Sequence, residues 1–375
     1  MKRKILLFFI LVVVFILVAC SSGNVDSVEE GKESGFQKEA PAVEDYIGQQ
    51  IDIKEDGTIQ LPFDEQVLVA TFSEDGAQKI FGIEGVILLI DDDEIVYAEE
   101  HKSIFHLHSD EITISDDGRF AAWRNHMENF EISIYDFESQ TAYLIEETEE
   151  LDPYMVFTPF LITNYDNGYY LSANTHLVGS SPPLIVDLNE MKLTDSRELI
   201  EKISPKEPVE DDDTYHEIRA EASTLGLNDG IYSEYGYYNF YFDYEDYDED
   251  DISLTLTKLY GNDVTNGVLS EIQLEGLDFE QDDIEVFRFT HKLLDTLTLK
   301  VSDNGMFIIP VVDGDLEENN YQLSVYVANL TDKNPVAKLL VEEDVTEERP
   351  TVFFNEDNSA IYVSKKGELQ KYNID

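Results

Sequence analysis

The sequence predicts an all-β fold for residues 46–375. Short strand-like runs separated by turn residues recur along this stretch, and only residues 195–203 carry a helical pattern. Turn residues repeat at spacings of 42 from Gly76 to Gly118 and 53 from Gly305 to Asn358. One meander per period of about 40–50 residues is typical of a four-stranded propeller blade. Among sandwiches, barrels and propellers, the repeat therefore favours a single β-propeller of six, or alternatively seven, four-stranded blades.

The clearest repeat unit is residues 112–146. Strands are expected at residues 112–114, 120–123, 132–137 and 141–145, which together make one antiparallel meander. The first two are joined by Ser115-Asp-Asp-Gly118, in which Asp can bond its own backbone and Gly can take positive φ. Weaker copies of this turn stand at residues 71–76, 301–305 and 353–358.

Further strands are expected along the rest of the chain, at residues 67–72, 86–90, 169–173, 184–186, 237–244, 252–259, 293–301, 306–312, 322–327, 352–354 and 360–364. The last unit, residues 351–374, shows only three strands. We therefore predict that residues 50–53 or 58–61 supply the fourth and close the ring, which would remove free sheet edges. The single expected helix, residues 195–203, begins at a capping-box pattern and ends at Pro205.

Two segments of the clearest unit resemble a known family. The sequences SDDGRFAAW (residues 115–123) and ISIYDFES (residues 132–139) are similar to the serine-(proline)-aspartate-glycine and strand-aspartate pattern of WD-repeat and TolB-like propellers. The resemblance covers about three units. The proline of the pattern is absent, and no unit has the Gly-His or Trp-Asp pairs of WD repeats. The resemblance implies a propeller fold.

The N-terminus indicates export. Residues 2–4 are basic, residues 5–19 are an apolar run too short to span the roughly 30 Å hydrocarbon core, and Leu17-Val-Ala-Cys20 resembles a lipobox. We therefore expect residues 1–19 to be a bacterial lipoprotein signal peptide; an uncleaved N-terminal anchor is the alternative. The resemblance implies acylation of Cys20, the only cysteine of the chain, and anchoring at the extracytoplasmic face of the cell membrane.

Residues 20–45 are rich in Ser, Gly and Glu and poor in apolar residues. Such a stretch cannot bury enough surface to offset its ordering entropy, so we expect a disordered tether after the lipidated cysteine. Its root-mean-square reach would be roughly 25–30 Å. The propeller domain is then residues 46–375.

The chain is strongly acidic, with 80 acidic against 25 basic residues and a formal charge of −55. This excess repels phosphates and anionic headgroups, so nucleic acid is excluded as a partner. Self-repulsion should also raise many carboxyl pKa values in the folded state. We therefore expect stability to increase as the pH falls from about 7 to about 5, and with added salt.

Acid runs at residues 91–94, 210–213 and 243–251 offer oxygen ligands for calcium, but none has the spaced D-x-D-x-D-G loop, and solvated loops explain them equally. Asp313, Asp315 and Glu317 come closer to that spacing, although the glycine stands in the wrong place. They are the candidate metal ligands, and Ca²⁺ is the only cofactor considered. His106 and His108 would share one face of a strand near His101, either as part of a metal site or as ordinary surface residues.

The aromatic run at residues 235–247 is the candidate binding surface. Strand alternation places Tyr237, Tyr241 and Asp243 on one face, where they could stack on sugars or receive cationic groups. A strand with an ordinary tyrosine-lined outer face is the alternative. Trp123, the sole tryptophan, is expected in the core.

No catalytic signature is present: there is no Gly-x-Ser-x-Gly elbow and no phosphate-binding glycine loop. We therefore expect a monomeric, membrane-anchored binding or scaffold propeller for an envelope protein, peptide or glycan, without catalytic activity. The alternative is a divalent-cation-dependent propeller hydrolase or lyase.

Overall fold

The computed structural model divides the chain into two units, residues 1–35 and 36–375. It describes residues 36–38, 43–101, 111–126, 131–145, 160–173, 184–194, 218, 220–227, 238–244, 253–263, 267–279, 281–287, 299–302, 304–315, 320–332, 334–346, 350–355 and 357–374. The signal segment, Cys20, the two paired histidines and the expected helix at residues 195–203 lie outside these residues.

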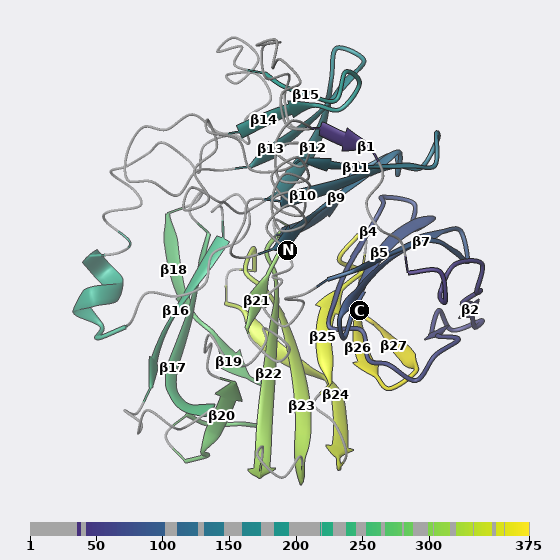
Figure 1. The fold of residues 1–375 in the computed structure, drawn as a ribbon. Coiled ribbons are helices and arrows are strands. Elements are labelled where there is room, and N and C mark those ends of the chain that lie inside the picture. The colour runs from purple at the N-terminus through teal and green to yellow at the C-terminus, as the bar shows by residue number, and fades with distance from the viewer. Residues whose placement is uncertain are drawn as a thin grey trace, which may run out of the picture. The chain divides into compact units, whose positions relative to one another are not determined.

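The described strands form five sheets, three of which are built on an antiparallel four-stranded meander (Figure 1). Sheet 1 contains β4 (Val69–Phe72), β5 (Gln78–Ile83), β6 (Val86–Asp91) and β7 (Glu94–Glu100). Sheet 2 contains β8 (Ile112–Ile114), β9 (Phe120–His126), β10 (Glu131–Asp136) and β11 (Thr141–Ile145), with β1 (Phe36–Lys38) added at the β11 edge. Sheet 3 contains β12 (Phe160–Tyr165), β13 (Gly168–Ala173), β14 (Leu184–Asp187) and β15 (Lys192–Leu193). These sheets confirm the predicted all-β class.

Residues 238–345 do not separate into four-stranded blades. They form sheet 4, with nine strands: β16 (Tyr238–Tyr244), β17 (Ser253–Asp263), β18 (Val268–Glu271), β19 (Gln273–Leu274), β20 (Ile284–Phe287), β21 (Lys300–Val301), β22 (Met306–Asp315), β23 (Asn320–Asn329) and β24 (Val336–Val345). The reason is β20, which pairs with β17 on one side and with β22 on the other. The predicted number of blades therefore stays a prediction.

Sheet 5 joins the two ends of the folded unit. It contains β25 (Thr351–Phe354), β26 (Ala360–Lys365) and β27 (Glu368–Asn373), completed by β3 (Ile59–Gln60) and β2 (Asp52–Ile53). Ile59 pairs with Leu369, and the Gln60 amide donates to the Gly367 carbonyl oxygen at 2.6 Å. The prediction that an N-terminal strand completes the last unit is confirmed: residues 59–60 lie next to β27, and residues 52–53 lie next to them.

The predicted turn recurs with one hydrogen-bond pattern. In sheet 2, the Ser115 hydroxyl donates to Asp117 at 2.9 Å and accepts the Phe120 N–H at 3.0 Å, while Gly118 takes a φ of +72°. The same pattern, with Asn replacing some of these residues, opens sheets 1 and 5 and the β21–β22 hairpin, at residues 73–78, 355–360 and 302–306. The turn before Gly168 differs from this pattern. There the positive φ values belong to the two preceding residues, Asp166 and Asn167, as in a tight hairpin.

The core consists of apolar layers between successive sheets. Neighbouring residues on a strand enter different layers: Ile80 packs toward sheet 2, whereas Phe81 packs toward sheet 5. Further layers join sheet 2 to sheet 3 and sheet 5 to sheet 4. Sheets 1, 2 and 5 are thus buried on both faces, as stacked propeller blades are. Trp123 is fully buried in the layer between sheets 1 and 2, as predicted.

The N-terminal residues of the folded unit cover the outer strands of three sheets. We call residues 36–60 the N-terminal arm. Strand β1 pairs with β11, Val43 and Gly48 donate to carbonyl oxygens of β7, and β2–β3 complete sheet 5. Strand β1 lies within the stretch that composition predicts to be a tether, so the paired structure begins before residue 46.

Candidate functional site

Sheets 1 and 2 have two distinct ends. At one end lie the tight turns at residues 73–77, 92–93, 115–119 and 137–140; we call it the turn end. At the other, which we call the loop end, lie the tight turn at residues 84–85 and the described strand ends at Glu100, Ile112, His126 and Ile145. The Glu74 N–H donates to the Asp116 carbonyl oxygen at 3.1 Å, which joins the turn ends of the two sheets.

A buried polar cluster lies at the loop end. Glu99 on β7 is 1% exposed, and its carboxylate accepts the Ser133 hydroxyl at 3.0 Å and the Tyr97 hydroxyl at 3.2 Å. Ser133 belongs to β10, so this carboxylate connects sheet 1 to sheet 2. Burial raises the pKa of Tyr97, and the negative charge of Glu99 and the hydrogen bond to it raise that pKa further. The Tyr97 hydroxyl therefore stays protonated and donates.

A second buried pair adjoins it. The Arg124 Nη1 lies 2.6 Å from the Glu111 Oε1, and the two side chains are 13% and 3% exposed. The ring of His101, at the end of β7, lies with Nε2 2.7 Å from the Arg124 carbonyl oxygen. Because a carbonyl oxygen only accepts, this nitrogen carries the ring proton. His101 therefore ties the end of sheet 1 to β9 of sheet 2.

This arrangement positions chain segments. Taking charges out of water costs several kcal/mol per ion, and apolar residues of similar size would pack sheets at lower cost. The buried groups lie close in the chain to the described ends of β7 at Glu100, of β8 at Ile112 and of β9 at His126. We call Glu99, His101, Glu111, Arg124 and Ser133 the loop-end cluster. The hydrogen bonds and the ion pair of this cluster hold the ends of β7, β8 and β9 in place.

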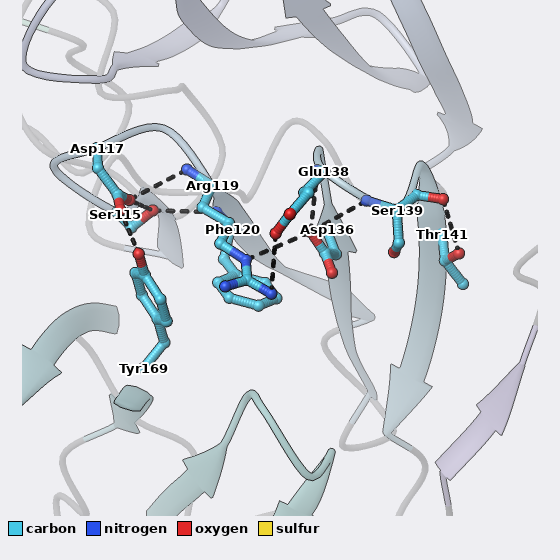
Figure 2. Close-up of polar contacts among 9 residues, drawn as sticks. All are labelled: Ser115, Asp117, Arg119, Phe120, Asp136, Glu138, Ser139, Thr141 and Tyr169. Carbon is cyan, nitrogen blue, oxygen red and sulfur yellow. Dashed lines mark hydrogen bonds and ion pairs between the residues drawn. The ribbon is translucent and has the colours of Figure 1, made fainter. Parts of the chain in front are cut away.

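A second polar cluster lies at the turn end, between sheets 2 and 3 (Figure 2). The Arg119 guanidinium lies 4.9 Å from the Phe120 ring centre and 5.2 Å from that of Tyr169, on β13 of sheet 3. It also faces Glu138 at 3.2 Å and Asp136 at 3.8 Å. Figure 2 shows these groups gathered around one arginine, with the Tyr169 hydroxyl donating to Asp117. The cluster fastens the two sheets together.

The pKa shifts in this cluster follow from its hydrogen bonds. Burial alone would raise the pKa of the Asp117 carboxyl, but hydrogen bonds from Tyr169, Ser115 and the Arg119 N–H, together with the Arg119 charge, lower it. The hydrogen bond to the Asp117 carboxylate raises the pKa of Tyr169, and burial adds to that shift. Both groups therefore keep their neutral-pH charges over a wide pH range.

The structure describes the candidate metal ligands only in part. Asp313 and Asp315 stand on β22 opposite Gln322 and Asn320, while Glu317 lies outside the described residues. Among the described His, Cys, Asp and Glu residues, no group of three is placed to hold a metal ion.

One residue of the candidate aromatic surface, Tyr241, is buried. Tyr241 is 1% exposed and packs against Ile218 and Ala222 of a short helix at residues 218 and 220–224, so it is not on an open face. The sequence pattern did not predict this helix. Asp243 pairs with Lys258 of β17 at 3.4 Å, and Tyr237 lies outside the described residues.

Sequence reasoning missed most of the loop-end cluster, noting only His101, as a neighbour of the paired histidines. The signal was a charged residue at an inward position of a strand: Glu99 follows Tyr97 by two residues, on the buried face of β7. Partners such as Ser133 are distant in the chain, so no sequence pattern indicates the pairing.

Within the described ranges, no helix is long and apolar enough to cross a membrane.

No family model matches the chain, and no curated protein sequence matches it. Among solved structures, that of U3-55K is similar with 7% identity and a TM-score of 0.34, covering 87% of this chain and 98% of the other. The structure of the Dos1 propeller is similar with 10% identity and a TM-score of 0.31, covering 87% and 82%. At these TM-scores the likeness carries no argument about this chain.

Proposed function

We propose that this protein is a lipid-anchored, extracytoplasmic β-propeller that binds an envelope protein, peptide or glycan through its loop end, without catalysing a reaction. The sheets supply a rigid base, because sheets 1, 2 and 5 are packed on both faces and repeat one turn geometry at the opposite end. Acylation of Cys20 supplies the membrane attachment.

The observation that carries the proposal is the loop-end cluster. Three charged side chains, those of Glu99, Glu111 and Arg124, are buried where two connections meet the sheets. The turn end also buries charge, with Lys79 3% and Asp136 7% exposed. There, however, Lys79 donates to the carbonyl oxygens of Ala77 and Asp92 and Asp136 accepts the N–H groups of residues 138 and 139, so these bonds lie within the turns of single sheets. Binding residues are disproportionately found on loops positioned by a rigid scaffold. We assign binding to the loop end because its buried Glu99 connects sheet 1 to Ser133 of sheet 2.

Two experiments test the proposal. Metabolic labelling with a fatty-acid analogue should mark the wild-type chain and leave Cys20→Ala unlabelled and uncleaved. Labelling of Cys20→Ala at the wild-type level would refute the anchor.

The binding end is tested by exchanging connections. Residues 127–130 at the loop end and residues 137–140 at the turn end are each replaced by Gly-Ser-Gly-Ser, and envelope partners cross-linked to the wild-type chain in cells are quantified. The loop-end exchange should abolish the specific adducts, and the turn-end exchange should keep them. Equal recovery from both variants, with unchanged circular dichroism, would show that the loop end is not the binding end.

A further inference from the structure

One face of strands β16, β17 and β18 is covered by a short helical segment, residues 218 and 220–227, the teal coil in Figure 1. Its residues Ile218 and Ala222 pack with Tyr241 of β16. At the end of the segment, the Lys258 Nζ of β17 donates to the Leu225 carbonyl oxygen at 3.0 Å. We call residues 218 and 220–227 the cover segment.

Asn262 of β17 lies beneath the cover segment. It stands directly opposite Leu269 of β18, which packs against the same cluster, and directly opposite residues of antiparallel strands share a face. Tyr260, two residues before it, stands opposite Tyr241. Asn262 is 0% exposed, and neither its Oδ1 nor its Nδ2 has a hydrogen-bond partner among the described residues. The covered face therefore buries a carboxamide whose hydrogen bonds are not made.

This burial works against the cover segment. A buried amide without partners has lost its bonds to water, and it regains them when the segment moves away. One such group shifts the equilibrium toward the open form roughly 5- to 150-fold. The opposing attraction is small, because three buried apolar side chains form this cluster, whereas each of the other apolar clusters of the described residues has at least ten. A helix this short is not stable in water by itself.

We propose that the cover segment is a releasable cover: it opens locally while the sheets stay folded, and the buried amide of Asn262 favours the opening. The sequence pattern places Tyr241 on an outer face of β16, and the structure shows that face closed by the cover segment. Another molecule can touch Tyr241 and Asn262 only in the open form. The cover segment therefore controls access to this part of sheet 4, independently of the lipid anchor and of binding at the loop end.

Hydrogen exchange of the full-length chain tests the local opening. The Leu227 amide donates to the Ala222 carbonyl oxygen at 3.0 Å within the cover segment, and the Ile272 amide donates to the Leu259 carbonyl oxygen at 2.9 Å within sheet 4. We expect the Leu227 amide to exchange at least roughly tenfold faster than the Ile272 amide. About 1 M urea should not accelerate it, because a local opening exposes little surface. Exchange of both amides at one rate would overturn the proposal.

The variant Asn262→Leu isolates the contribution of the amide. Leucine has the shape of asparagine without its polar atoms, so exchange of the Leu227 amide should slow roughly tenfold. Asn355→Leu is the matched control: Asn355 is 4% exposed, but its Nδ2 donates to Asp357 and its Oδ1 accepts the Ala360 N–H. That variant should accelerate exchange at Ala360 and leave Leu227 unchanged. An unchanged or faster Leu227 rate in Asn262→Leu would overturn the role of Asn262.

A buried thiol gives a second measurement that leaves Asn262 in place. In the full chain with Cys20, its only cysteine, replaced by serine, Ala222→Cys puts a thiol on the inner side of the cover segment, at a position that is 1% exposed. Ala122→Cys puts one in the layer between sheets 2 and 3, at a position that is 0% exposed. A thiol reagent should label position 222 at least roughly tenfold faster than position 122. Equal labelling of the two positions would show that the cover segment does not open ahead of the sheets.

Discussion

Replacing Arg124 with methionine should destabilise the protein strongly, because it leaves Glu111 charged and buried with its arginine partner gone. The Glu111 side chain is 3% exposed and its Oε1 lies 2.6 Å from the arginine Nη1, so water cannot replace the lost partner without opening the site. Removing one partner of a buried ion pair costs about 3–5 kcal/mol. Spread over about 330 residues that unfold together, this corresponds to a lowering of Tm by about 4–7 °C.

The double variant Glu111→Met with Arg124→Met separates the causes. If the cost arises from a buried carboxylate that has lost its arginine, removing that carboxylate should recover at least half of the lost stability, since buried pairs are often replaceable by apolar residues. Urea unfolding, followed by circular dichroism, measures the free energies of unfolding of the three variants and the wild type. Arg119→Met is the matched control: Arg119 is 35% exposed, and losing its ion pairs and ring contacts should cost about 1 kcal/mol. A loss below that of Arg119→Met, or no recovery in the double variant, would refute the reasoning.

Two further predictions concern the repeated turns. Gly118→Ala should cost about 0.5–1.5 kcal/mol more than Gly85→Ala in the same urea assay. Both glycines have positive φ, but of the two only Gly118 would place its new Cβ against the end of the Gln78 side chain, which would have to move off its hydrogen bond to Asp91. Equal costs would contradict this contact. Turn hydrogen bonds lower the pKa of the Asp carboxyls at positions 56, 75 and 357, as hydrogen bonds and Arg119 lower that of Asp117. A lowered folded pKa gives stability that is present above the unfolded value of about 3.8 and lost as the pH falls through the folded value. The melting temperature should therefore fall as the pH is lowered from about 5 to about 2. Asp357→Asn should make this fall less steep. A variant with the same dependence of melting temperature on pH as the wild type would contradict the prediction.

These shifts correct one expectation from composition. The formal charge of −55 led us to expect raised carboxyl pKa values from self-repulsion. Every described carboxyl with a resolved shift moves the other way, because local backbone and hydroxyl donors in the turns lie closer than the other acids.

Local chemistry made part of the fold predictable. The Ser115–Gly118 turn follows from residues that bond their own neighbours, and the strands expected at residues 112–114 and 141–145 have those bounds in the structure. Completion of sheet 5 was predictable because three strands leave one edge that needs a partner. Strand β20 was not predictable, because its pairing with both β17 and β22 depends on contacts far apart in the chain.

The site was less predictable than the fold. Alternation placed Tyr241 on an outer face, but it cannot show that a helix more than ten residues away in the chain covers that face. Glu99 and Ser133 are separated by 34 residues and lie on different sheets, so neither residue signals the other. A charged residue at an inward strand position, such as Glu99, indicates a buried polar contact. Only the structure identifies its partner as Ser133.

The pairing of β3 with β27 also bears on the order in which the protein folds. The Gln60 amide and Gly367 carbonyl are 307 residues apart in the chain. Closing a flexible loop of that length carries a length-dependent entropy cost of about 5 kcal/mol. Sheet 5 cannot be completed until the last strands have been synthesised, so β2 and β3 wait for β27. Folding of this sheet is then a late and slow event, governed by the arrival of the C-terminus.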